Sequence, residues 1–92
     1  MRNLVFLPKA WQDLGWWMKN DIKNVKKIYN LLENTCKTPF DGIGQPEPLK
    51  ANYSGYWSRR ITDEHRIVYK VSGTKGVDQK CLIIQCRFHY DD

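Results

Sequence analysis

The order of apolar and polar positions predicts one strand, two helices and then three strands. Leu4–Leu7 is a short apolar run ended by Pro8, which is typical of a buried strand that leads directly into a helix. Apolar residues then recur every three or four positions in two segments, Ala10–Met18 and Ile22–Leu32. This spacing predicts two amphipathic helices separated by a short polar break.

The second half of the chain is predicted to form strands and loops. Prolines and glycines recur so often in Thr38–Pro48 that we predict no regular structure there. Tyr56–Tyr69 reads as two strands joined by a polar turn, and Lys80–Arg87 is an apolar last strand. Helices followed by strands predict an α+β fold, with both helices packed on one face of a small, mainly antiparallel sheet. The other face would remain open.

Composition narrows the class of protein. Ninety-two residues with 41% apolar content predict a single folded domain that spans residues 1–92. The net charge of +5 favours an anionic partner, either nucleic acid or an acidic protein, although it also serves simple solubility. An odd number of cysteines argues against a disulfide scaffold and for a reducing cytoplasm. The first apolar run is too short for a signal peptide or a membrane span.

Three arginines in the predicted hairpin are candidates for phosphate binding. Arg59 and Arg60 are neighbours in one strand, so their side chains point to opposite faces. One of the two shares the open face with Arg66, and the register of the hairpin decides which. A guanidinium there would bind a phosphate through two parallel hydrogen bonds. The alternative is a set of ion pairs with Asp63 and Glu64 in the turn.

Glu47 and His89 are candidates for acid–base chemistry. Glu47 lies between two prolines, which hold its backbone stiff and extended, although an isolated glutamate is more often a plain surface residue. His89 comes just after the last strand and titrates near neutrality, as a proton donor must. Tyr90 beside it would stack on a base or cover an apolar edge. His65, in the hairpin turn, is interpreted as a turn residue and not as a catalyst.

The sequence predicts no metal site and no cofactor. Cys81 and Cys86 are five residues apart on a strand, so they face opposite ways and cannot share an ion. Gly42 and Gly44 lack the rest of a nucleotide-binding glycine motif.

Three segments together resemble one known family. Thr38–Lys50 is similar to the T-P-F-x-G-x-G-x-P-E-P-L-K segment of the YoeB toxins. Ser54–Tyr69 is similar to their S-G-x-W-S-R-R-I-x-x-E-H-R-x-V-Y segment, and Cys86–Tyr90 matches their C-R-x-H-Y ending. These toxins belong to the RelE-like toxins of bacterial type II toxin–antitoxin systems.

The resemblance implies a microbial RNase-like, or RelE-like, fold and an activity. The expected activity is a ribosome-dependent messenger RNA endonuclease that acts in the ribosomal A site and so inhibits translation. In such enzymes the ribose 2′-hydroxyl attacks the adjacent phosphate, which leaves a 2′,3′-cyclic phosphate and a free 5′-hydroxyl. That reaction needs a base, an acid and a cation, and no metal.

The resemblance also implies roles for individual residues. Glu47 would be the general base, His89 the general acid, and Arg66 the group that stabilises charge on the phosphate. Tyr90 would hold or stack the substrate near the scissile bond. The expected substrate-binding residues are Lys50, Arg59 and Arg60.

The expected partners follow from the same resemblance. They are an acidic, YefM-like antitoxin, the ribosome with its messenger, and operator DNA through the antitoxin complex only; a toxin homodimer is a further expectation, and no membrane is involved. The alternative functions are a ParE-like toxin or binding module without nuclease activity, or a protein that acts mainly as co-repressor with its antitoxin.

Overall fold

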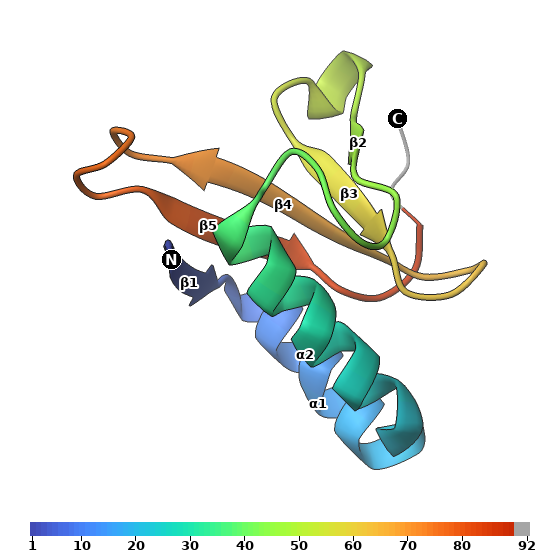
Figure 1. Ribbon diagram of the computed structural model, residues 1–92. Helices are drawn as coiled ribbons and strands as arrows, with labels where there is room; N and C mark the ends of the chain where they lie inside the picture. Colours follow the sequence, from blue (N-terminus) through green and yellow to red (C-terminus); the bar gives the residue numbers. More distant parts are fainter. Residues whose placement is uncertain (90–92) are drawn as a thin grey trace.

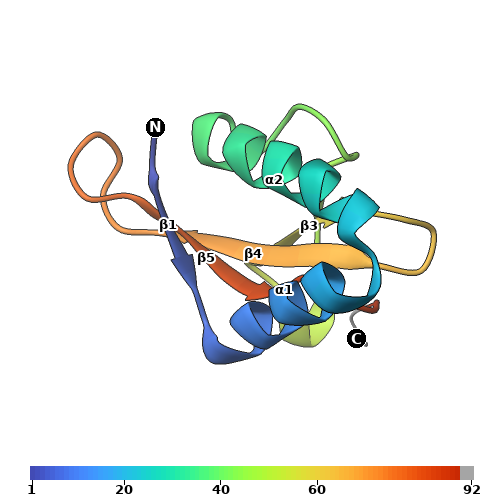
Figure 2. The same ribbon diagram turned by 90° about the horizontal axis from the view of Figure 1, so that it is seen from below.

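The computed structural model describes residues 1–89 and contains two helices and five strands. In chain order the elements are β1 (Asn3–Phe6), α1 (Pro8–Asn20), α2 (Ile22–Lys37), β2 (Glu47–Pro48), the short 3₁₀ helix η1 (Ala51–Tyr53), β3 (Trp57–Arg60), β4 (Arg66–Ser72) and β5 (Lys80–Gln85). The strands form one sheet in the order β1-β5-β4-β3-β2, and both helices lie on one side of it (Figure 1 and Figure 2). β1 runs parallel to β5, whereas the other neighbours are antiparallel. The predicted α+β fold is confirmed.

Leu7 joins the first strand to the first helix. Its N–H donates to the Ile83 carbonyl at 3.0 Å, which continues the β1–β5 ladder by one bond. Its carbonyl accepts the N–H of Trp11 at 3.1 Å, and Pro8 occupies the first turn of the helix, where a missing N–H costs nothing. The strand therefore lies one residue earlier than Leu4–Leu7, because Leu7 already belongs to the helix cap.

The hydrophobic core lies between the helices and the sheet. The predicted apolar stripes are buried only in part: Trp11, Met18 and Ile22 are exposed, whereas the remaining stripe residues pack toward the core. The fully buried members of the core include Ala10, Trp17, Ile28, Leu31 and Cys36 from the helices, and Ile67, Tyr69, Cys81 and Ile83 from the sheet. Neither helix within residues 1–89 has the length and apolarity that a membrane crossing requires.

Two side chains of α1 hold the end of the last strand. The Trp17 indole N–H donates to the carbonyl of Cys86 at 2.7 Å, and the N–H of Cys86 donates to the Asp13 carboxylate at 3.0 Å. Both backbone polar groups of this buried residue are thus paired with α1. The first helix consequently sets the point at which the C-terminal segment, residues 86–89, leaves the sheet.

The loop that precedes the hairpin ends in a strand, contrary to the prediction for Thr38–Pro48. Glu47 and Pro48 form β2, which pairs antiparallel with Ser58 and Trp57 at the edge of the sheet. A proline disfavours helical geometry in the residue before it, and an edge strand tolerates a missing N–H. The prolines that make this segment look irregular therefore suit its last two residues to an edge strand.

The Trp17–Cys86 bond predicts a measurable loss of stability. Trp17→Phe keeps an aromatic ring but leaves a buried carbonyl without its donor, so we expect the free energy of unfolding to fall by about 1–3 kcal/mol. Trp11→Phe is the matched control, because Trp11 is 66% exposed, and it should change stability by less than about 0.5 kcal/mol. Urea denaturation of the two variants measures the difference. Equal losses would contradict the assigned role of the indole N–H.

Candidate functional site

The register of the sheet gathers a carboxylate and two guanidinium groups on one face. Glu47 of β2 pairs with Ser58 of β3, and Arg60 of β3 pairs with Arg66 of β4. Directly paired residues share a face, and so do residues two apart in one strand, so Ser58 and Arg60 lie on the same side. Glu47, Arg60 and Arg66 therefore share the face opposite the helices.

Arg60 and Arg66 are like charges placed directly opposite each other, which is unfavourable unless other groups offset it. Arg60 forms an ion pair with Asp63. The Arg66 Nη1 donates to the carbonyl oxygens of Thr62 at 2.6 Å, Asp63 at 3.2 Å and His65 at 3.1 Å. The Arg60–Asp63 pair is solvent-exposed and stabilises by at most about 1 kcal/mol, so a phosphate can replace the carboxylate at little cost.

His89 meets Arg66 at one carbonyl oxygen. The Nε2 atom of His89 lies 3.0 Å from the Asp63 carbonyl, which also accepts the hydrogen bond from Arg66. A carbonyl oxygen only accepts, so the bond fixes a proton on Nε2. The Gln85 amide donates to the carbonyls of Arg87 at 3.3 Å and of His89 at 3.5 Å. His89 is thereby held at the hairpin turn.

The backbone of Phe88 completes this attachment. Its carbonyl accepts the N–H of Arg66 at 3.1 Å, and its N–H donates to Nδ1 of His65 at 2.8 Å. The sequence-based interpretation treated His65 only as a turn residue and missed its contact with a segment 23 positions away. In the sequence itself, the position of His65 immediately before Arg66 was the only indication that it lies near the site.

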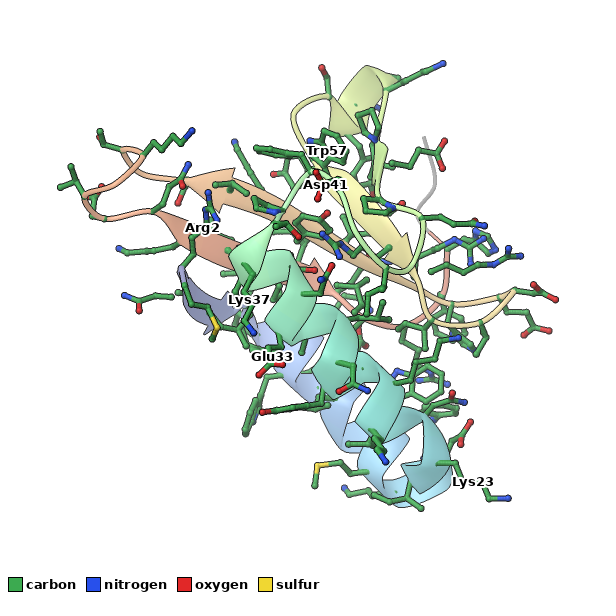
Figure 3. All side chains as sticks on the ribbon, viewed as in Figure 1. Arg2, Lys23, Glu33, Lys37, Asp41 and Trp57 are labelled. Carbon is green, nitrogen blue, oxygen red and sulfur yellow. The ribbon has the colours of Figure 1, made fainter. Side chains whose placement is uncertain are left out.

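Arg59 lies on the opposite face from Arg60, and the prediction that it binds substrate is wrong. Its side chain is fully buried, so it offers no surface to a ligand. Its guanidinium donates to the Tyr69 hydroxyl at 3.1 Å, the carbonyls of Thr38 at 2.6 Å, Asp41 at 3.0 Å and Ile43 at 3.1 Å, and the Asn34 side-chain oxygen. Arg59 therefore anchors the loop that leads to Glu47. In Figure 3, the labels of Asp41, which lies in this loop, and of Trp57, which begins β3, show where the loop contacts the strand.

Two further hydrogen bonds hold the same loop against the sheet. The Tyr69 hydroxyl donates to the Pro39 carbonyl at 2.6 Å, and burial raises the pKa of Tyr69, so the hydroxyl keeps the proton that this bond needs. The carbonyl of Gly44 accepts the N–H of Arg60 at 2.7 Å. Gly44 has a φ of +80°, and a Cβ on it would lie 2.5 Å from the Leu31 side chain. Glycine is required there on both counts.

The remaining predicted site residues are placed as follows. Glu47 is exposed on the edge strand, and Lys50 is exposed immediately before η1, three positions further along the chain. Tyr90 lies outside the described residues 1–89. The register thus places Glu47, Arg60 and Arg66 on the face opposite the helices. That face is not open throughout as predicted, because Ser58 and Val68 on it are buried. His89 contacts the hairpin turn beside Arg66, and Lys50 follows the edge strand.

Comparison with known proteins identifies the family. A family model described as "YoeB-like toxin of bacterial type II toxin-antitoxin system" matches residues 6–90. The chain belongs to this family. It is 52% identical to the toxin YoeB of Synechocystis sp. over 95% of each chain. It is 49% identical to the toxin YoeB of Escherichia coli over 95% of this chain and 98% of that protein.

Solved structures of other YoeB toxins have the same fold. A YoeB/ParE toxin from Agrobacterium tumefaciens superposes with a TM-score of 0.91 at 52% identity, over 96% of this chain and 99% of that chain. The YoeB toxin in a heterotetrameric YoeB–YefM complex from Staphylococcus aureus superposes with a TM-score of 0.82 at 42% identity, over 98% and 99% of the chains. YafQ from E. coli, at 16% identity and a TM-score of 0.68, shares the fold.

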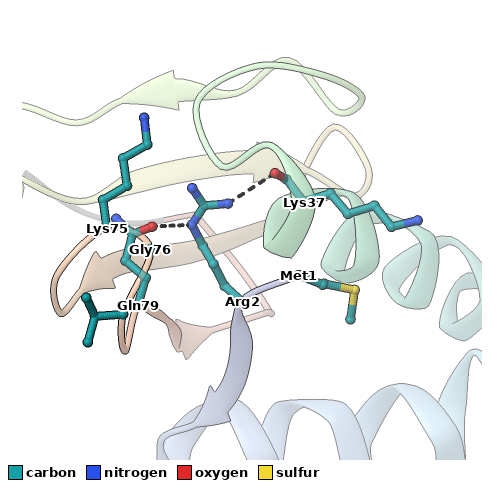
Figure 4. A pocket seen from close by; sticks show the side chains of 7 residues that line it. Met1, Arg2, Lys37, Lys75, Gly76 and Gln79 are labelled. Carbon is teal, nitrogen blue, oxygen red and sulfur yellow. Dashed lines mark hydrogen bonds between the residues drawn. The ribbon is translucent and has the colours of Figure 1, made fainter.

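One cavity of this YoeB-like toxin lies away from the predicted site residues. It measures about 550 Å³ and is lined by Arg2, Lys37, Lys75 and Gln79, among others (Figure 4). A second cavity of about 370 Å³, between α2 and the Gly44 loop, includes Arg60. The register of the sheet and the hydrogen bonds of the hairpin turn, and not a cavity, define the candidate site.

The cysteines of this toxin belong to its core. Cys36, Cys81 and Cys86 are free thiols that are at most 1% exposed. A hydrogen bond from the Cys81 thiol lowers the pKa of Cys36 to about 7, and burial raises the pKa of Cys86 to about 12. No group of three His, Cys, Asp or Glu residues within positions 1–89 is arranged to hold a metal ion.

The two neighbouring arginines of β3 provide a matched test of the site's construction. Arg59→Lys retains the charge but cannot reach five acceptors, so we expect the free energy of unfolding to fall by about 3 kcal/mol or more. Arg60→Lys, whose ion pair with Asp63 is exposed, should cost less than about 1 kcal/mol. Guanidinium chloride denaturation followed by tryptophan fluorescence measures both. Arg59→Lys and Arg60→Lys proteins of equal stability would show that the buried network does not anchor the loop.

Proposed function

We propose that this toxin is an endoribonuclease that cleaves messenger RNA in the A site of the ribosome and so inhibits translation. The observation that carries the proposal is the convergence of Arg66 and His89 on the Asp63 carbonyl, beside the strands that present Glu47 on the same face. A carboxylate, a guanidinium and an imidazole are the groups that a metal-independent transfer of a phosphate ester to the 2′-hydroxyl requires.

Each of the three groups takes one part of the reaction. The Glu47 carboxylate accepts the proton of the ribose 2′-hydroxyl as its oxygen forms a bond to phosphorus. The bond from phosphorus to the 5′-oxygen breaks, and His89 gives that leaving oxygen a proton. Arg66 binds the negative charge that builds up on the phosphate oxygens. The products are a 2′,3′-cyclic phosphate and a free 5′-hydroxyl.

The surroundings of the site support these roles. The extended backbone and the β-ladder bond hold Glu47 in place although its side chain is exposed. The contact with the Asp63 carbonyl requires a proton on the His89 Nε2 atom. Lys50 and Arg60 bind neighbouring phosphates in this proposal, and Tyr90 holds or stacks the substrate near the scissile bond.

The exposure of the proposed site residues supports dependence on the ribosome. Glu47, Lys50 and His89 are all exposed to solvent. Acid–base groups accelerate a reaction only when the reacting atoms are held in line, which a flexible single strand does not achieve alone. In the proposal, the ribosome holds the messenger while the toxin supplies the chemistry.

An acidic antitoxin is the proposed protein partner. Two solved relatives from S. aureus are YoeB–YefM complexes, and another is described as a YoeB dimer. The charge of +5 on this chain suits an acidic, YefM-like segment that covers the arginine-bearing face. The toxin would then contact operator DNA only through that complex, and would act in the cytoplasm.

Removal of the acid or the base should stop cleavage without unfolding the protein. We expect Glu47→Gln and His89→Gln each to lower the single-turnover rate on programmed ribosomes by about 10²–10⁴-fold. Both side chains are exposed, so the denaturation midpoint should change little. The assay maps the cut and identifies the ends of the products.

Glu64→Gln is the matched control, because Glu64 is an exposed carboxylate of the hairpin turn that has no part in the proposed reaction. It should cleave at the rate of the parent protein. The proposal would be refuted if the Glu47→Gln and His89→Gln proteins cleaved as fast as the parent protein, or if the products carried a 5′-phosphate.

A further inference from the structure

His65 sits between the first helix and the C-terminal segment. Its ring centroid lies 4.9 Å from that of Trp17, in an edge-on contact, and 6.2 Å from that of Trp16. The Phe88 ring lies 5.5 Å away. The His65 Nδ1 atom accepts the N–H of Phe88 at 2.8 Å. This ring therefore makes both a packing contact and a directed hydrogen bond.

Phe88 has a backbone conformation that needs such support. Its φ is +67°, in the left-handed region that side chains other than glycine adopt at an energetic cost. Residues in this region persist where the surrounding structure holds them, and they cluster at functional sites. Two bonds hold Phe88, one from its N–H to His65 and one from the Arg66 N–H to its carbonyl. The reversal at Phe88 returns the next residue, His89, to the hairpin turn.

We infer that His65 is a positioning residue, whose unprotonated Nδ1 holds Phe88 in the left-handed conformation and thereby keeps His89 on the Asp63 carbonyl beside Arg66. The inference rests on the proposed function, because this alignment affects a rate only if His89 delivers a proton. The two histidines of the chain then have separate roles. His89 gives a proton to the leaving oxygen, and His65 holds Phe88, which places His89 beside Arg66.

The chemistry of the ring explains why histidine stands at position 65. Packing against Trp16 and Trp17 requires only a flat ring, which phenylalanine also provides. The hydrogen bond from the Phe88 N–H requires an acceptor one atom beyond Cγ, which the side-chain oxygen of asparagine also provides. Histidine combines the two, with its ring proton on Nε2 when neutral.

Two substitutions separate these properties. His65→Phe keeps the packing and removes the acceptor, so stability should stay near that of the parent while kcat falls about tenfold at unchanged KM. His65→Asn keeps the acceptor and removes the ring, so the protein should be less stable while kcat stays within about threefold. A residue with a purely structural role would give the opposite order, with activity following stability. The measurements are cleavage kinetics on programmed ribosomes and urea denaturation.

A double substitution tests whether His65 acts through His89. In a His89→Gln background, His65→Phe should cause no further loss of rate, because the group that it aims is gone. A further tenfold loss in that background, or a His65→Phe single variant as fast as the parent, would overturn the inference. Glu47→Gln serves as the separate check on the reaction itself, since it lowers the rate whether or not His65 aims the acid.

A readout without catalysis distinguishes failure of this inference from failure of the proposed function. Nitrogen chemical shifts of the His65 ring should show an unprotonated Nδ1 at neutral pH. Exchange of the Phe88 amide proton should be slow in the parent and in His65→Asn, and fast in His65→Phe. A protonated Nδ1, or equal exchange in all three proteins, would refute the inference even if the parent cleaves RNA. If the parent does not cleave, the proposed function fails and these signals alone decide whether His65 holds Phe88.

Discussion

The site of this toxin depends on a guanidinium that is buried completely. A charge removed from water is costly unless every donor finds an acceptor, and Arg59 meets this demand with oxygen atoms from Tyr69, α2 and the loop after α2. That loop forms little regular structure of its own, so the pairing with Arg59 decides its path. The path ends in β2, and β2 carries Glu47. A residue that never touches substrate in the proposed reaction thus places the proposed base.

One strand uses adjacent arginines for opposite purposes. Arg59 points to the helices and fixes the loop, whereas Arg60 points away from them and lies opposite Arg66. Within the fold, Arg59 is surrounded by fixed acceptors and holds no charge available to a ligand. Arg60 and Arg66 concentrate positive charge on that surface, where Arg60 forms an exposed ion pair with Asp63 and Arg66 donates to backbone carbonyls of the hairpin turn.

Residues 86–89 depend on contacts from two elements, α1 and the turn between β3 and β4. α1 fixes Cys86 through Trp17 and Asp13, and the hairpin turn fixes Phe88 and His89 through backbone and ring atoms. The proposed acid, His89, therefore lies in a segment that is held at Cys86, Phe88 and His89. Such ties are needed because short segments outside the core open easily when only one bond holds them.

Local patterns in the sequence were sufficient for both helices and for four of the five strands described, but not for β2, which lies in a segment predicted to be irregular. Helical and strand periodicity, and the effect of proline on its neighbours, act over a few residues and can be read directly. The same alternation shows that Arg59 and Arg60 face opposite ways, but it cannot say which one is buried, because that depends on the register with β4 and on where α2 packs. The bond between His65 and Phe88 joins residues 23 positions apart, and that between Arg59 and Asn34 joins residues 25 apart. Contacts of this kind have no periodic signature in the chain, so only the tertiary structure decided which side chains build the site and which of them hold it in place.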